Sequence, residues 1–263
     1  MATIMHPYDP TEVQAETNPL LQYFMRHSGP VIHKWVDYFD VYHRTFQRFR
    51  GKPIKFLEIG VQNGGSAHMW REYFGPQATI IGVDIDPACK ALENDGFEIW
   101  IGDQADPDFW ENFLRVHPQF DIVLDDGGHT MEQQIVTFES LFPALVDGGV
   151  YLCEDTHTSY FPMHGGGLRK PGTFHEYVKE LVDRMHAWYH APIAAVAEAS
   201  YAAKNLYAMT VFDSIVVMEK RLKNMPVALA RGYQSHTPVP LALTFLDTRR
   251  LFGVPDEGSE PQG

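Results

Sequence analysis

The sequence predicts an α/β fold whose mostly parallel sheet ends in an antiparallel hairpin, and two patterns support this. Between residues 55 and 220, short apolar runs alternate with longer amphipathic stretches. This alternation is typical of βαβ units and of a parallel sheet covered on both faces. Two final strand-like runs, 206–211 and 214–219, are separated only by Phe212 and Asp213. A connection this short permits only an antiparallel pair.

The expected elements follow in order along the chain. The strand runs are 55–60, 78–85, 97–103, 120–126 and 149–155. The helical stretches are 66–74, 87–94, 107–116, 131–145 and 173–190. Earlier, apolar residues at helical spacing predict a helix from Pro30 to about Phe49, with a packed stripe of Trp35, Tyr38, Phe39 and Tyr42. We therefore divide the chain into an N-terminal helical arm (1–50), a core (51–222) and a C-terminal extension (223–263) with a disordered tail.

Composition narrows the possible partners. The 263 residues, 44% of them hydrophobic, can form a full α/β core. With 34 acidic and 21 basic residues the net charge is −13, which repels nucleic acid and acidic membranes. No apolar run is long enough to span a membrane, and the N-terminus lacks the pattern of a signal peptide. The two cysteines lie in apolar stretches, so we expect a cytoplasmic protein.

A glycine-rich turn, FLEIGVQNGGS (56–66), joins the first core strand to a helix. Glycines there allow unusual backbone angles and the close approach of a ligand. The turn is not the dinucleotide fingerprint, because Gln62 occupies the position of its second glycine. Asp84 ends the next strand, and Asp103 and Gln104 end the third. A tight turn with solvated acids is the simpler alternative, but the order of these features along one sheet edge favours a nucleoside site.

In these features the chain resembles the class I S-adenosylmethionine-dependent methyltransferases, whose Rossmann-like sheet also closes with an antiparallel hairpin. The resemblance implies S-adenosyl-L-methionine as cofactor. It also implies a binding role for seven residues: Glu58, Gly60, Gly64 and Ser66 around the methionine part, Asp84 at the ribose, and Asp103 and Gln104 at the adenine. By the same resemblance, His33, Lys34 and Trp35 would cover the cofactor from the N-terminal side.

Acidic residues gather at the ends of the fourth and fifth strands, in DDGGH (125–129) and EDTH (154–157). Parallel strands place these ends at one edge, where so many like charges need a cation between them. Oxygen ligands favour Mg²⁺ over zinc. Neighbouring strand residues point to opposite faces, so Asp125 and Asp126 cannot both reach one site while the strand is regular. Alternatively, Asp155 caps the segment that follows it and Asp125 accepts hydrogen bonds from nearby backbone amides, without any metal.

This second pattern resembles the Mg²⁺-dependent sugar O-methyltransferases of macrolide biosynthesis, of the mycinamicin and demethylmacrocin type. The resemblance runs from about Trp35 to Tyr160 and is specific in DDGGH and EDTHTSY. It implies that Asp126, Glu154 and Asp155 bind Mg²⁺ and that His129 is the catalytic base. The expected substrate is a sugar hydroxyl of a glycoside or saccharide.

Other functions remain open at this stage. A catechol-like phenol also chelates Mg²⁺, although such enzymes usually show a D…D-N pattern. A nicotinamide oxidoreductase is disfavoured by Gln62 and by the terminal hairpin. A non-catalytic nucleoside- or metal-binding protein is a further class. We also expect a homo-oligomer, for which the aromatic N-terminal helix would supply an interface.

Overall fold

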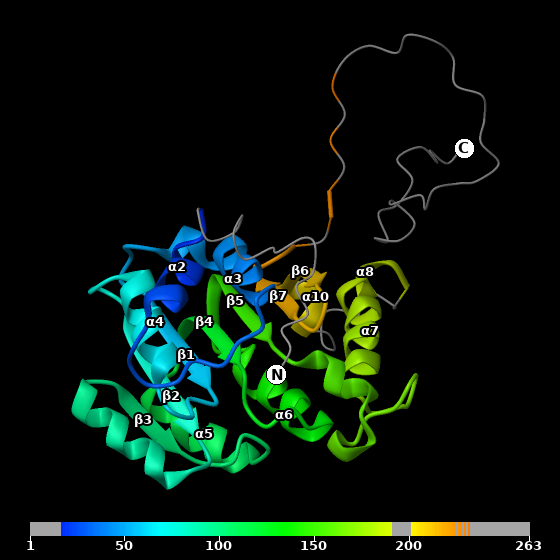
Figure 1. The fold of residues 1–263 in the computed structure, drawn as a ribbon. Coiled ribbons are helices and arrows are strands. Elements are labelled where there is room, and N and C mark those ends of the chain that lie inside the picture. Colours follow the sequence, from blue (N-terminus) through cyan, green and yellow to red (C-terminus); the bar gives the residue numbers. More distant parts are fainter. Residues whose placement is uncertain (1–16, 191–200, 225, 228, 230, 232–263) are drawn as a thin grey trace, which may run out of the picture.

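A single seven-stranded sheet forms the centre of the structure, a computed structural model that describes residues 17–190, 201–224, 226, 227, 229 and 231 (Figure 1). Its strands lie in the order β3-β2-β1-β4-β5-β7-β6. They are β1 (Lys55–Ile59), β2 (Thr79–Asp84), β3 (Glu98–Ile101), β4 (Phe120–Asp125), β5 (Leu145–Cys153), β6 (Leu206–Val211) and β7 (Val216–Lys220). The first five strands are parallel, and β7 runs antiparallel to both β5 and β6. The predicted fold class is confirmed.

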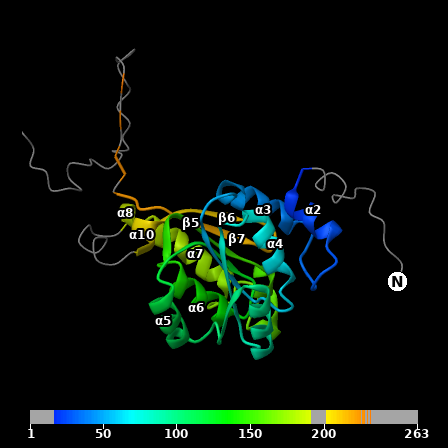
Figure 2. The same cartoon turned by 90° about the vertical axis from the view of Figure 1, so that its left-hand side faces the viewer.

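Helices cover both faces of the sheet (Figure 2). One face carries α2 (Pro19–Arg26), α3 (Tyr38–Phe46) and α4 (Gly65–Phe74). The other carries α5 (Pro107–Val116), α6 (Met131–Leu141) and α7 (Phe174–Met185). Shorter helical elements are η1 (Gln47–Phe49), η2 (Pro87–Asp95), η3 (Thr156–Tyr160), η4 (Pro162–His164), α8 (Ala187–His190) and α10 (Tyr201–Asn205).

The largest local difference from expectation precedes the first core strand. The predicted helix from Pro30 begins only at Tyr38, and residues 30–35 run without helix or strand. In that segment the side chain of Lys34 reaches acidic residues far along the chain, at positions 126 and 154. A long-range ionic contact thus outweighs the local helical spacing. The stretch at 87–94 is also a 3₁₀ helix, not an α-helix.

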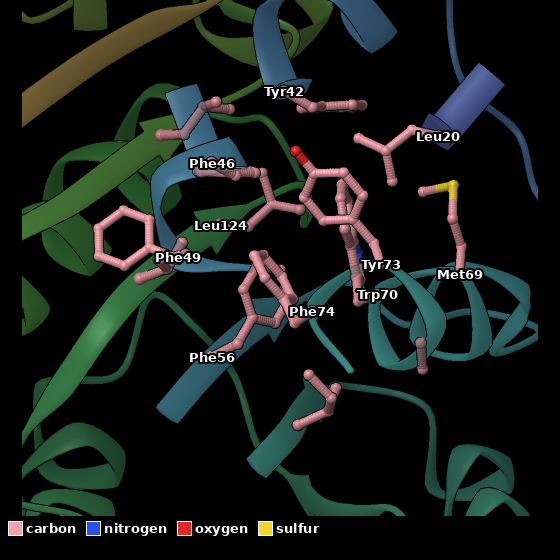
Figure 3. Packing of buried hydrophobic residues seen from close by; sticks show 14 of the residues in the cluster. Leu20, Tyr42, Phe46, Phe49, Phe56, Met69, Trp70, Tyr73, Phe74 and Leu124 are labelled. Atoms are coloured by element: carbon pink, nitrogen blue, oxygen red, sulfur yellow. The ribbon is translucent and has the colours of Figure 1, made fainter. Parts of the chain in front are cut away.

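Aromatic side chains of α3 and α4 form the core on one sheet face (Figure 3). Phe46 and Trp70 both contact Phe56 of β1, with ring centroids 6.2 and 5.2 Å away. Tyr42 and Phe46 are fully buried. The aromatic side chains of α3 are therefore buried in the core of the chain and are not available as an interface. A homo-oligomer stays a prediction.

The described part of the chain contains no helix long and apolar enough to cross a membrane. Most of the predicted C-terminal extension, 223–263, lies outside the described residues. The division into arm, core and extension therefore stays a prediction.

Candidate active site

The carboxyl edge of the parallel strands carries most of the predicted site residues. Gly60 follows β1, Asp84 ends β2, Asp126 follows β4 and Glu154 follows β5. Two adjoining pockets open along this edge, and both are lined by Gly60 and Asp126. The strand-end pocket lies over β2 and β3, and the acidic pocket lies beside residues 31–35.

The strand-end pocket brings together Asp84, Asp103 and Gln104, three of the residues predicted to bind cofactor. Asp84 is half-buried and accepts hydrogen bonds from the backbone N–H groups of Gln62 and Asp86, at 3.0 and 2.9 Å. It therefore fixes the glycine loop in addition to lining the pocket. Asp103 is exposed beside it, where its carboxylate is open to a ligand.

Gln104 differs from the other two because the protein already uses its side-chain amide. The amide nitrogen donates to Asp125 and to the hydroxyl of Thr137, both at 3.0 Å. The amide oxygen accepts from the N–H of Gly128 at 2.6 Å. Gln104 therefore holds the chain after β4 in place, and its contact with adenine stays a prediction.

The glycine loop depends on two left-handed glycines. Gly60 has φ +85° and Gly64 has φ +79°, a region that other residues rarely adopt. A Cβ on Gly60 would also collide with the carbonyl oxygen of Asp126. Glycine at position 60 thus lets the loop lie directly against the end of β4, which joins the two pockets.

Glu58 and Ser66 lie beneath the glycine loop, both buried. Oε1 of Glu58 accepts a hydrogen bond from the indole of Trp70 at 3.0 Å. Its other oxygen, Oε2, has no hydrogen-bond partner among the described residues. Burial raises the pKa of Glu58 to about 7. A buried carboxylate oxygen without a donor is a position at which a ligand's amino group would be stabilised.

Asp125, which ends β4, and Asp126, which follows it, have different surroundings, as the alternation of side chains along a strand predicts. Asp125 is buried and accepts hydrogen bonds from Gln104 and from the hydroxyl of Tyr151, at 3.0 and 2.8 Å. Asp126 lines the acidic pocket instead. Asp125 is thus a structural acid that ties β4 to β5.

At the end of β5 the chain turns, and the turn lets two neighbouring acids reach the same pocket. Asp155 has a left-handed φ of +52° immediately after Glu154. Glu154 accepts a hydrogen bond from the hydroxyl of Tyr42, and Asp155 accepts one from that of Tyr38, each at 2.5 Å. Helix α3 therefore orients both carboxylates.

Asp126, His129 and Asp155 form a group that could hold a metal ion, with ligand atoms within 4.8 Å of one another. Nε2 of His129 lies 3.4 Å from Asp155 and 3.8 Å from Asp126. The next residue, Thr130, forms a capping box with Gln133 and so anchors His129 at the start of α6. Burial lowers the pKa of His129, which favours a neutral ring that can accept a proton.

Glu154 is not part of that group, and its carboxylate is paired with Lys34. The Lys34 ammonium donates to both carboxylate oxygens of Glu154 at 3.1 Å and also to Asp126. Burial by itself would lower the pKa of Lys34, but the two carboxylates raise it well above its usual value. From the sequence alone, Lys34 is expected only to cover the cofactor. The sequence signal that could have indicated this ion pair is the single lysine in the otherwise largely apolar stretch PVIHKWVDYF (30–39).

Ser214, in the link between β6 and β7, is a second residue that the sequence analysis missed. Its hydroxyl is hydrogen-bonded to the hydroxyl of Tyr38 at 2.7 Å and to Nδ1 of His157 at 2.5 Å. The ring of Trp35 stacks on His157 with centroids 4.8 Å apart. No local motif marks Ser214, since its role depends on a strand that returns from far along the chain.

Known proteins that are similar to this chain in sequence are methyltransferases. Residues 57–156 match the family described as a methyltransferase domain. The chain is 36% identical over 206 residues to the 8-demethyl-8-(2-methoxy-alpha-L-rhamnosyl)-tetracenomycin-C 3'-O-methyltransferase of Streptomyces olivaceus, covering 74% of this chain and 52% of that protein. It is 33% identical over 223 residues to the L-olivosyl-oleandolide 3-O-methyltransferase of Streptomyces antibioticus, covering 80% and 56%.

A solved structure has the same fold. The MycE methyltransferase of the mycinamycin biosynthetic pathway, in complex with Mg, SAH and mycinamycin VI, superposes with a TM-score of 0.65 at 26% identity. The match covers 82% of this chain and 63% of MycE. The chain spans about half the length of the curated relatives that it matches. The matched core contains the glycine loop and both acidic strand ends, and the chain belongs to the methyltransferase family.

Proposed function

We propose that this protein is an S-adenosyl-L-methionine-dependent and Mg²⁺-dependent O-methyltransferase that acts on a sugar hydroxyl of a glycoside. The observation that carries the proposal is the grouping of Asp126, His129 and Asp155 directly beside the glycine loop. The relatives described above are named as sugar O-methyltransferases, and MycE was solved with Mg, SAH and a glycoside.

The described residues fit the cofactor. A methionine ammonium group would satisfy the unpartnered Oε2 of Glu58, with Gly60, Gly64 and Ser66 around the rest of that part. The carboxylate of Asp84 would accept hydrogen bonds from the ribose hydroxyls. Asp103, exposed at the next strand end, would accept from the exocyclic amine of adenine.

The donor set fits Mg²⁺ in its chemistry. Asp126, Glu154 and Asp155 are the proposed ligands, all carboxylates, which a hard divalent cation prefers. When bound, Mg²⁺ lowers the pKa of a hydroxyl group that it coordinates and so makes its proton easier to remove. Mg²⁺ favours oxygen, which leaves the ring of His129 free to act as a base.

His129 would remove the proton of the acceptor hydroxyl. An ordinary histidine titrates near 6.5, whereas water, an approximate guide to a sugar hydroxyl, has a pKa of about 15.7. The mismatch of about 9 units corresponds to roughly 12 kcal/mol, too large for imidazole alone. Nε2 of His129 would accept the proton of the acceptor hydroxyl, and S-adenosyl-L-methionine, when bound, would supply the methyl group that this oxygen accepts, with S-adenosylhomocysteine as the thioether product.

The proposal is tested with labelled S-adenosyl-L-methionine and a panel of glycosides, sugar nucleotides and catechols. We expect transfer to a glycoside that stops with EDTA and returns with Mg²⁺ or Mn²⁺, while cofactor binding survives chelation. Asp126→Asn should lose turnover, whereas Asp108→Asn, an exposed acid of α5, should not. Full turnover after exhaustive chelation would refute the metal dependence, and transfer only to catechols would refute the sugar acceptor.

A further inference from the structure

The acidic pocket already contains a cation supplied by the chain itself. The Lys34 ammonium lies between Asp126 and Glu154, and its side chain is only 3% exposed. The ring of Tyr42 lies 5.7 Å from the ammonium nitrogen, and the Tyr42 hydroxyl donates to the same Glu154 carboxylate. Both oxygens of Glu154 are thus used inside the protein.

This arrangement conflicts with Glu154 as a ligand of Mg²⁺. A carboxylate ligand lies about 2.0–2.1 Å from Mg²⁺, which is closer than any ammonium contact. Lys34 contacts Glu154 at 3.1 Å through both oxygens, and it also holds Asp126. Two cations within a few ångströms repel each other strongly, so the metal and the ammonium cannot share these carboxylates at these positions.

We propose that Lys34 is a resident cation of the acidic pocket, which a divalent cation must displace from Glu154 to bind with all three proposed ligands. This inference rests on the proposed function, because it takes Glu154 as a metal ligand. Lys34 then has two effects: it offsets part of the negative charge of Asp126 and Glu154 before metal arrives, and it lowers the apparent affinity for metal.

The segment that carries Lys34 is suited to such an exchange. Residues 31–35 form neither helix nor strand. The carbonyl oxygens of Pro30 and Val31 lie against Gly65, where a Cβ would collide with both. The segment therefore crosses the start of α4, beside the glycine loop. Release of Lys34 from Glu154 would loosen the cover of the acidic pocket at that point.

Calorimetric titration with Mg²⁺ alone tests the competition. Lys34→Met keeps the length and apolar stem of the side chain without the charge. We expect it to raise the affinity for Mg²⁺ by about tenfold or more, since a competing positive charge is removed. Lys179→Met is the matched control, because Lys179 forms only a surface ion pair with Glu176, and its affinity should equal that of the wild type.

A second measurement uses the unaltered chain and so does not depend on the folding of a variant. Lysines are acetylated with an amine-reactive reagent, with EDTA or with saturating Mg²⁺, and the sites are read by mass spectrometry. We expect Lys34 to be protected with EDTA and to become reactive with Mg²⁺, while Lys179 reacts equally in both. Lys34 that stays protected while calorimetry records Mg²⁺ binding would overturn this inference and leave the proposed metal dependence intact. Absence of Mg²⁺ binding to both wild type and Lys34→Met would overturn both.

Discussion

His129 has a backbone and a side-chain environment that suit a base. Its φ of +57° lies in the left-handed region, directly after two glycines. Thr158 donates a hydrogen bond from its hydroxyl to the carbonyl oxygen of His129 at 2.8 Å. The backbone conformation of His129 and the start of α6 therefore together position the ring. This position does not require a bond between a metal and Nε2.

We expect His129→Ala to lower turnover by about 10²–10⁴-fold, the usual contribution of a positioned base. His129→Gln should behave similarly, because an amide cannot take the proton. Burial lowers the pKa of His129, so the wild-type rate should rise with pH through a value below 6.5 and then level off. Steady-state rates across pH check this, and the acidic limb should be missing in both variants. Binding of Mg²⁺ and cofactor should persist; near-normal turnover of His129→Ala would show that another group is the base.

Asp84 fixes the glycine loop and also lines the strand-end pocket, so its removal tests the proposed cofactor site. We expect Asp84→Ala to weaken binding of S-adenosyl-L-methionine by on the order of 1–3 kcal/mol, through loss of a charge-assisted hydrogen bond. Calorimetry measures the effect. Asp86→Ala serves as the control, because Asp86 caps η2 through the N–H of Ala88 and does not line the strand-end pocket. Equal losses in both variants would indicate a general effect of local charge or stability.

At the scale of elements, the pairing of β4 with β5 carries the site. The register places Asp125 opposite Cys153, so the residues that follow both strands emerge together at one edge. Asp126 and Glu154 are these residues, and the N–H of Glu154 donates to the carbonyl oxygen of Asp125 at 2.8 Å. The separation between the two acidic segments is thereby set by a backbone ladder rather than by loops.

The buried Asp125 between these strands makes stability depend on pH. Burial raises its pKa to about 6, from an ordinary value of 3.8. A group whose pKa is raised by folding stabilises the folded state below its unfolded pKa and loses that contribution as pH rises through the folded value. Between about pH 4 and 6 the free energy of unfolding should fall by on the order of 3 kcal/mol more in the wild type than in Asp125→Asn. Urea unfolding in EDTA measures this, and parallel curves for the two proteins would exclude Asp125 as the cause.

The elements and the acids of the site were predictable, because their patterns are local. Apolar runs and strand-end acids mark β1 to β5, and the alternation of side chains correctly separated Asp125 from Asp126. Lys34 and Ser214 were not predictable in their roles. The acidic partners of Lys34 lie more than 90 positions away in the chain, and the partners of Ser214 lie more than 50 positions away. The prediction of a helix from Pro30 was wrong for the same reason. Sequence spacing reports the preferences of a segment and not the distant charge that it meets.

Across the molecule as a whole, α2 and α3 belong to the same core as the sheet. Residues of α2 and α3 pack in the same buried cluster as α4 and the sheet. The carboxylates of the acidic pocket are oriented by Tyr38 and Tyr42 of α3. Helix α3 thus contributes both to the core and to the acidic pocket.

We therefore expect Phe46→Ala to destabilise the entire fold by about 3–5 kcal/mol, the cost of removing a fully buried phenylalanine. Circular dichroism during urea unfolding should show one transition, shifted as a whole. Tyr207→Ala, at a half-exposed position of β6, should shift it little. Two separate transitions, with only the minor one affected by Phe46→Ala, would show that the arm folds independently of the core.

The position of β7 has a consequence for how the chain acquires its site during synthesis. The strands that line the strand-end pocket leave the ribosome early, and domains generally fold from the N-terminal side as they emerge. However, β7 is the last strand among the residues that the structure describes, and it lies inside the sheet, between β5 and β6. Ser214, just before it, bonds to both Tyr38 and His157. A nascent chain that has not yet reached Ser214 therefore lacks both this inner strand and the hydroxyl that joins Tyr38 to His157.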